Sequence, residues 1–99
     1  MSNCYKTETK LMKYLRDTEY PLYNTVKSLS DEIGMRNNYD ETALMYYIQY
    51  NKTLSLDIIE LLSSEIGMRD NENNTALIYY CRYSWFNHMH NIEVIKLLK

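Results

Sequence analysis

The sequence predicts an all-α protein in which three helix pairs stack side by side. Internal repetition is the main reason: residues 61–83 repeat residues 28–50 at a spacing of 33, with 14 of 23 aligned positions identical. Fixed periods of about 20–50 residues are typical of proteins built from stacked units. Within each copy, apolar residues recur at i, i+3 and i+4, which is the pattern of an amphipathic helix. With only two glycines and one proline, the chain has no linker, and we predict a single domain, 1–99.

The repeat can be followed back into the first third of the chain, where it is least regular. Thr9 lies 33 residues before Thr42, which lies 33 residues before Thr75. A Thr side chain can accept a hydrogen bond from an N–H of the first helical turn, so each Thr predicts the start of a first helix. The second helices of units two and three are expected over 58–62 and 94–98. The three units are then roughly 1–33, 34–66 and 67–99.

Each first helix is expected to turn an apolar stripe inward. The stripe is Leu44, Tyr47 and Ile48 in unit two, and Leu77, Tyr80 and Cys81 in unit three. On this pattern Cys81 is a buried thiol. Four acidic residues are expected to be solvated on outer helix faces: Asp57, Glu60, Glu65 and Glu93. Gly34 and Gly67 follow the second helices, where glycine tolerates the left-handed backbone that ends a helix.

The segments Thr42-Ala43-Leu44 and Thr75-Ala76-Leu77, with Asn37 and Asp70 five residues before them, resemble the ankyrin repeat. The resemblance covers almost the whole chain. It implies an ankyrin-type helix–turn–helix solenoid of three repeats with short projecting turns. The form Leu-Leu-x-x-Glu-Ile-Gly-Met-Arg-Asp also resembles ankyrin arrays expanded in diplomonad-type protists. A tetratricopeptide array has a similar period, but it lacks the Thr-Ala-Leu start and the turn between units.

Two departures from the family pattern bear on packing. Tyr14, Tyr47 and Tyr80 occupy a position at which the family prefers a small residue. Such rings add volume where helices pack closely, so either the units are splayed or the three rings stack as a ladder. The His of the family's helix-capping network is replaced by Met12, Met45 and Ile78.

The resemblance also implies which residues contact a partner, because the family binds through its turn tips and the outer ends of its first helices. The corresponding residues of units two and three are Asn38, Tyr39, Glu41, Gln49, Tyr50, Asn71, Glu72, Asn74, Arg82 and Tyr83. The divergent unit one offers Tyr5, Lys6, Glu8, Arg16 and Asp17. Trp85, in the longest loop, is added as an exposed aromatic anchor. The other interpretation is that Trp85 or Phe86 folds back over the open end of unit three.

Composition and charge argue against two classes of partner, nucleic acids and membranes. A formal charge of −2 without clustered Lys and Arg argues against a nucleic-acid partner. The longest apolar run, residues 54–62, is interrupted by polar and charged residues and is shorter than the roughly 20 residues that span a membrane, so no membrane partner is expected. The N-terminus does not resemble a signal peptide, and two cysteines do not make a disulfide framework. An intracellular, cytoplasmic location is expected.

Patterns for catalysis and metal binding are weak. His88, His90 and Cys81 lack the repeated spacing of a zinc site. No nucleophile–base arrangement and no glycine-rich phosphate loop can be recognised. We therefore expect no enzyme activity, no metal and no cofactor.

The predicted function is that of a protein–protein interaction module, an ankyrin-repeat scaffold that presents a tyrosine-rich and mildly acidic concave surface to a protein partner. A second interpretation is a structural fragment of a larger repeat array that binds nothing by itself. Unit three ends at Leu97-Leu98 without the polar cap that normally closes a stack, so self-association through this uncapped C-terminal repeat is also expected.

Overall fold

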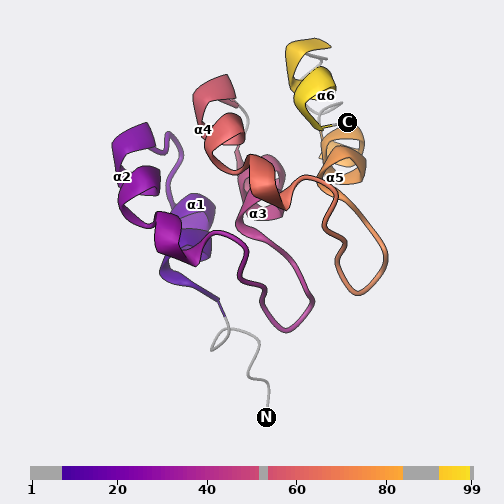
Figure 1. Ribbon diagram of the computed structural model, residues 1–99, viewed down its shortest axis with the longest axis horizontal. Coiled ribbons are helices and arrows are strands. Elements are labelled where there is room, and N and C mark those ends of the chain that lie inside the picture. Colours follow the sequence, from indigo (N-terminus) through magenta and orange to yellow (C-terminus); the bar gives the residue numbers. More distant parts are fainter. Residues whose placement is uncertain (1–7, 52–53, 84–91, 99) are drawn as a thin grey trace.

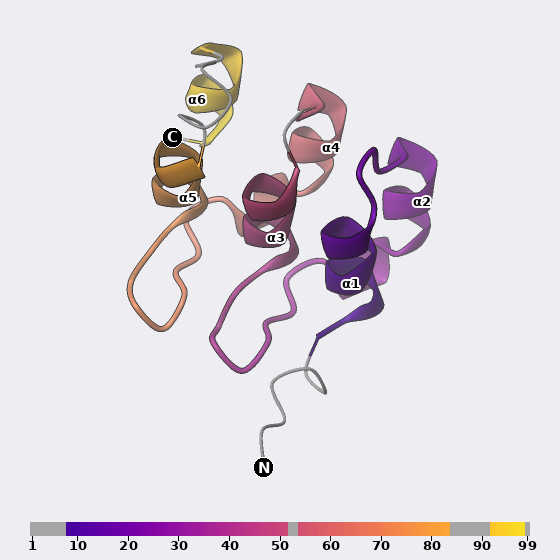
Figure 2. The ribbon, with the colours of Figure 1, turned by 180° about the vertical axis from the view of Figure 1, so that it is seen from behind.

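The computed structural model describes residues 8–51, 54–83 and 92–98, and all regular secondary structure in these ranges is helical. The all-α prediction is therefore confirmed for the described residues. Three helix pairs lie side by side, with the first helices in one row and the second helices in another (Figures 1 and 2). The pairs are α1 (Lys10–Asp17) with α2 (Tyr23–Ser28), α3 (Ala43–Tyr50) with α4 (Leu56–Leu61), and α5 (Ala76–Tyr83) with α6 (Ile92–Leu98). Short 3-10 helices, η2 (Ser30–Glu32) and η3 (Ser63–Glu65), follow α2 and α4.

The helices begin where the repeated threonines predict. The side chains of Thr9, Thr42 and Thr75 each accept the backbone N–H three residues later, at 3.1, 3.4 and 3.4 Å. Gly34 and Gly67 follow the 3-10 helices with φ angles of 98° and 92°, the left-handed region that favours glycine. The two glycines thus adopt the same left-handed backbone conformation at equivalent places of successive units.

The core lies between the two rows of helices. α3 packs on α1 and α5 packs on α3, while α4 packs on both α2 and α6. The predicted stripe of α3 is buried throughout, and Tyr80 of α5 is buried as well. The expected burial of Cys81 is wrong, because its side chain is exposed. Leu15 and Ile48 occupy the same position in α1 and α3 and are buried, whereas no further first helix among the described residues follows α5.

The expectation of a solvated Glu65 is also wrong. Its side chain is fully buried, and its carboxylate accepts the backbone N–H groups of Gly34 at 2.7 Å and Leu44 at 2.8 Å. Glu32, 33 residues earlier, accepts the Leu11 N–H at 2.8 Å. Each carboxylate satisfies an N–H group of a first helical turn at the positive end of the helix dipole. Burial raises the pKa of Glu65 above its ordinary value, although the hydrogen bonds from Gly34 and Leu44 oppose this rise.

Tyr14 and Tyr47, which lie at equivalent positions of α1 and α3, each connect the two helices of a pair. Tyr47 and Tyr80 are buried, and Tyr14 is half-buried. The hydroxyl of Tyr14 accepts the N–H of Leu22 at 2.9 Å, and that of Tyr47 accepts the N–H of Ser55 at 2.6 Å. Leu22 and Ser55 are the N-cap residues of α2 and α4. These hydroxyls therefore cap the second helices, which is a different role from that of a ladder of stacked rings.

Projecting turns join one helix pair to the next, on the same side of the molecule (Figure 1). Asn37 Oδ1 accepts the backbone N–H groups two and four residues later, at 2.9 and 3.0 Å. Asp70 Oδ1 makes the same two contacts in the next turn, at 2.9 and 2.8 Å. The Asn71 N–H donates to the Tyr39 carbonyl at 2.9 Å, so neighbouring turns are bonded to each other. The turns are held at a fixed spacing beside the first helices.

Candidate functional site

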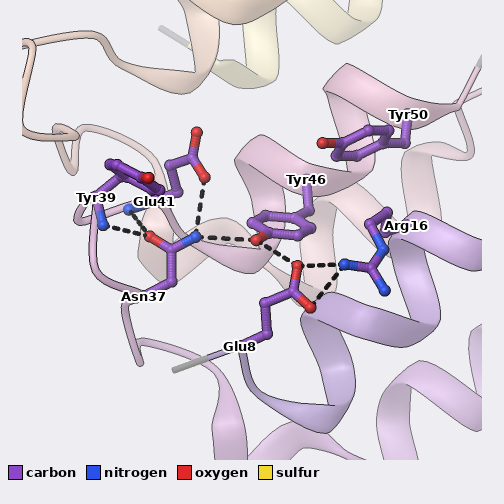
Figure 3. A pocket seen from close by; sticks show the side chains of 7 residues that line it. All are labelled: Glu8, Arg16, Asn37, Tyr39, Glu41, Tyr46 and Tyr50. Atoms are coloured by element: carbon purple, nitrogen blue, oxygen red, sulfur yellow. Dashed lines mark hydrogen bonds and ion pairs between the residues drawn. The ribbon is translucent and has the colours of Figure 1, made fainter. Parts of the chain in front are cut away.

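Two adjoining pockets follow the turns and the first helices. They have volumes of about 640 Å³ and about 310 Å³, and they share Tyr39 and Glu41, so we describe them as one surface, the turn groove. The first pocket (Figure 3) is lined by Glu8, Arg16, Asn37, Tyr39, Glu41, Tyr46 and Tyr50. The second pocket is lined by Tyr39, Glu41, Gln49, Asp70, Asn71, Glu72, Asn74, Tyr79 and Arg82.

The turn groove brings together most of the residues predicted to contact a partner. Eight of the eleven line it: Tyr39, Glu41, Gln49, Tyr50, Asn71, Glu72, Asn74 and Arg82. Asn38 is exposed but belongs to neither lining. The Tyr83 side chain and Trp85 fall outside what the structure describes. Of the unit-one candidates, Glu8 and Arg16 line the first pocket.

A series of hydrogen bonds links the first two helix pairs in the first pocket (Figure 3). Arg16 Nη1 donates to both carboxylate oxygens of Glu8 at 2.7 Å. Tyr46 Oη donates to Glu8 Oε2 at 2.7 Å and accepts one hydrogen of the Asn37 amide at 2.9 Å. The other hydrogen of that amide goes to Glu41 Oε1 at 2.9 Å. Every contact in the series therefore joins a donor to an acceptor.

The second pocket keeps the glutamate and the tyrosine of this arrangement, as Glu41 and Tyr79, but Gln49, Asp70 and Asn74 stand in the places of Arg16, Asn37 and Glu41. Tyr79 stands in the place of Tyr46, and its hydroxyl lies 3.0 Å from Glu41 Oε2. Asp70 stands in the place of Asn37, so the amide donor is replaced by a carboxylate whose Oδ2 lies 2.7 Å from the same hydroxyl. A phenol carries one hydrogen, which can complete only one of these two contacts at a time.

The pKa values follow from this geometry. Burial raises the pKa of Tyr46 and Tyr79 far above the usual value, and the hydrogen bonds to Glu8 and Asp70 add to the rise. Burial by itself raises the pKa of Asp70, but hydrogen bonds from Tyr79 and Asn74 outweigh it and hold the pKa below its ordinary value. At neutral pH both phenols are therefore protonated donors, and Asp70 is ionised.

Aromatic rings and carboxylates determine what the groove presents to solvent. Tyr39 is 49% exposed and Tyr50 is 47% exposed, and the Tyr50 ring lies 5.6 Å from that of Tyr46. The lining holds four carboxylates, from Glu8, Glu41, Asp70 and Glu72, and two guanidinium groups, from Arg16 and Arg82. The groove is therefore partly aromatic and carries a net negative charge.

The structure also bears on metal ions and membranes. Within residues 8–51, 54–83 and 92–98, no group of three or more His, Cys, Asp or Glu side chains is arranged to hold a metal ion. His88 and His90 lie outside these ranges. No helix in the described part of the chain combines the length and the apolar character needed to cross a bilayer.

Sequence reasoning missed the two tyrosines that connect successive helix pairs. Tyr46 bonds Glu8 and Tyr79 bonds Glu41, and in both cases 38 residues separate the partners. All four residues follow the 33-residue spacing, which was the available signal. The repeat could show that the positions are equivalent, but it could not show that they touch.

The chain gives no significant match to any family model, curated protein or solved structure. Its function therefore has to be inferred from the internal repeat and from the geometry of the turn groove.

Proposed function

We propose that this chain is an ankyrin-type stack of three repeats and acts as a protein–protein interaction module that binds a protein partner along the turn groove. The observation that carries the proposal is the convergence of eight predicted contact residues on one continuous surface. They come from two turns and from the ends of two first helices, α3 and α5. The groove lies beside all three helix pairs, as an extended contact with a partner requires.

The two half-exposed tyrosines support a binding role. Tyr39 projects from a turn and Tyr50 from the end of α3, and both line the first pocket (Figure 3). Tyrosine offers a large, rigid contact area with little side-chain entropy to lose, and it is enriched among the residues that dominate protein interfaces. We assign these two rings as the main anchors for the partner.

The charge of the groove favours a partner with a basic contact surface. Glu8 is neutralised by Arg16 at 2.7 Å, whereas Glu41 and Asp70 face each other across the Tyr79 hydroxyl. Complementary charge mainly speeds association and selects between partners, so binding should weaken as salt rises. We assign no catalytic role to these carboxylates, because they are hydrogen bonded to the scaffold.

The test compares wild type with the double variant Tyr39→Ser/Tyr50→Ser. Each protein captures partners from a cell extract, the proteins retained are identified by mass spectrometry, and the affinity of the purified partner is then measured. Tyr20→Ser is the control, since Tyr20 is 69% exposed and outside the groove. Loss of two anchors should weaken binding by roughly tenfold or more, with the melting temperature nearly unchanged.

Three outcomes would contradict the proposal. Unchanged affinity in the double variant would remove the tyrosines from the interface. A parallel loss of affinity and melting temperature would show that the rings belong to the core. If wild type retains nothing that a blank support does not, the second interpretation applies, a structural fragment without binding activity of its own.

A further inference from the structure

The outer face of α5 differs from the equivalent faces of α1 and α3. Met12 and Met45 are both fully buried, but Ile78, at the same position in α5, is 40% exposed. Cys81 is exposed at the position where Leu15 and Ile48 are buried. Since α3 packs on α1 and α5 packs on α3, the face that opens on α5 is the one on which a first helix packs elsewhere in the molecule.

The N-terminus of α5 also lacks a contact that α1 and α3 have. Leu11 N–H and Leu44 N–H each donate to a glutamate 21 residues later, Glu32 or Glu65, at 2.8 Å. The equivalent donor is the Leu77 N–H, and no acceptor for it occurs among the described residues. Among the described residues, α5 therefore has neither a helix that covers its outer apolar face nor a carboxylate that accepts the Leu77 N–H.

Residues at the opposite end of the stack argue against a second copy of this chain, bound through its α1, as the partner that covers the α5 face. Ala43 and Tyr46 of α3 are buried, and so are Ala76 and Tyr79 of α5. At the corresponding positions of α1 the chain has Lys10 and Lys13, and both are exposed. A second copy docking through its α1 would place these ammonium groups near the α5 face, where burial of charge is costly.

We propose that the outer face of α5 is a docking surface for one more helix-pair unit of the same type. The occupant carries a Glu-Ile-Gly segment, a turn, and a first helix with Ala and Tyr where α1 has Lys10 and Lys13. Its helix covers Ile78 and Cys81 as α5 covers α3, and its glutamate accepts the Leu77 N–H. This surface is separate from the turn groove, so the proposal stands or falls independently of the proposed function.

The test supplies the part of such a unit that would cover α5, namely its Glu-Ile-Gly segment, its turn and its first helix. A copy of residues 64–83 is attached after Lys99, so that Leu98 and Lys99 take the places of Leu62 and Ser63. Cys4→Ser in the chain and Cys81→Ser in the copy leave the original Cys81 as the only thiol. Alkylation of Cys81 by iodoacetamide should slow by roughly tenfold or more, because docking protects it as Leu15 and Ile48 are protected. The melting temperature and the helical circular-dichroism signal should rise.

Two matched copies serve as controls. Ala76→Lys/Tyr79→Lys within the appended copy imitates α1 and should leave Cys81 as reactive as in the unextended chain. Glu65→Gln within the copy should give intermediate protection. Unchanged alkylation and no added helical signal with the native copy would overturn the proposal. So would protection of Cys81 in the unextended chain as its concentration rises, together with a dimer in sedimentation, because the occupant would then be a second copy.

Discussion

The hydroxyl of Tyr79 lies 3.0 Å from Glu41 Oε2, although the two residues belong to successive helix pairs. The same hydroxyl lies 2.7 Å from Asp70 Oδ2, and its single hydrogen stands between two carboxylates. Between the first two helix pairs, the Tyr46 hydroxyl instead lies between the Glu8 carboxylate and the Asn37 amide, which donates to it. We call the contact between Tyr46 and Glu8 the first joint of the stack and the contact between Tyr79 and Glu41 the second joint. The two joints are alike in geometry but differ in charge, so the same substitution should affect stability differently at each.

Removing the phenol hydroxyl should cost more at the second joint. Tyr79→Phe leaves Glu41 and Asp70 facing each other without a hydrogen between them, and we expect a loss of about 2 kcal/mol in the free energy of unfolding. Tyr46→Phe should cost about 1 kcal/mol, because Glu8 keeps its ion pair with Arg16. Urea unfolding followed by circular dichroism measures both. An equal or larger loss for Tyr46→Phe would show that the second joint holds no charge conflict.

Glu65 should be sensitive to a substitution that changes little in shape. In Glu65→Gln an amide NH2 replaces one of the oxygens that accept the Gly34 and Leu44 N–H groups, and two donors then meet. We expect a loss of about 1–3 kcal/mol, the cost of an unsatisfied buried donor. Glu60→Gln, on the exposed side of α4, is the matched control and should change stability by less than about 0.5 kcal/mol. Similar effects of both variants would refute the capping role of Glu65.

The dependence of this effect on pH follows from the raised pKa of Glu65. A carboxyl group with a higher pKa in the folded state stabilises the fold fully below its unfolded pKa of about 4.3 and less as pH rises through the folded pKa. The gap in unfolding free energy between wild type and Glu65→Gln should therefore be widest in acid and narrow towards neutral pH. A gap that widens with pH would mean that the backbone N–H groups outweigh the cost of burying the charge.

Asp70 should act in the opposite direction. Its pKa lies below the ordinary value, so its contribution is present above the unfolded pKa of about 3.9 and is lost as pH falls through the folded pKa. Asp70→Asn, which restores the residue type of Asn37, should flatten the loss of stability in acid. Unfolding free energies measured from about pH 6 to about pH 2.5 test this, since wild type and variant should converge at the acid end. Parallel curves would remove Asp70 from the acid response.

Local signals explain which parts of the fold could be predicted. The threonine caps, the glycines with positive φ and the Asn37 and Asp70 turns depend on a few adjacent residues, and the 33-residue spacing makes each of them visible more than once. The same spacing, together with the resemblance to a known repeat, predicts most of the residues that line the turn groove.

Long-range contacts explain what could not be predicted. Glu65 has the sequence surroundings of a solvated charge, and only the approach of a helix start 21 residues away makes it a buried cap. Cys81 has the pattern of an inward residue, but its exposure depends on whether another first helix covers α5. The bonds from Tyr46 and Tyr79 to the preceding unit depend on how the units are set against one another, which a repeat pattern does not specify.

Tyr47 allows the roles of a ring and a hydroxyl to be separated. Its hydroxyl accepts the Ser55 N–H at 2.6 Å, and its ring is buried in the core. Tyr47→Phe keeps the ring and should cost about 0.5–1.5 kcal/mol, since only the cap of α4 is lost. Tyr47→Ala removes the ring as well, and we expect it to cost about 3–5 kcal/mol because a cavity is left behind. Tyr50→Phe, on a half-exposed ring, is the control. If Tyr47→Ala costs no more than Tyr47→Phe in urea unfolding, the helices can close over the site and the ring is not needed for packing.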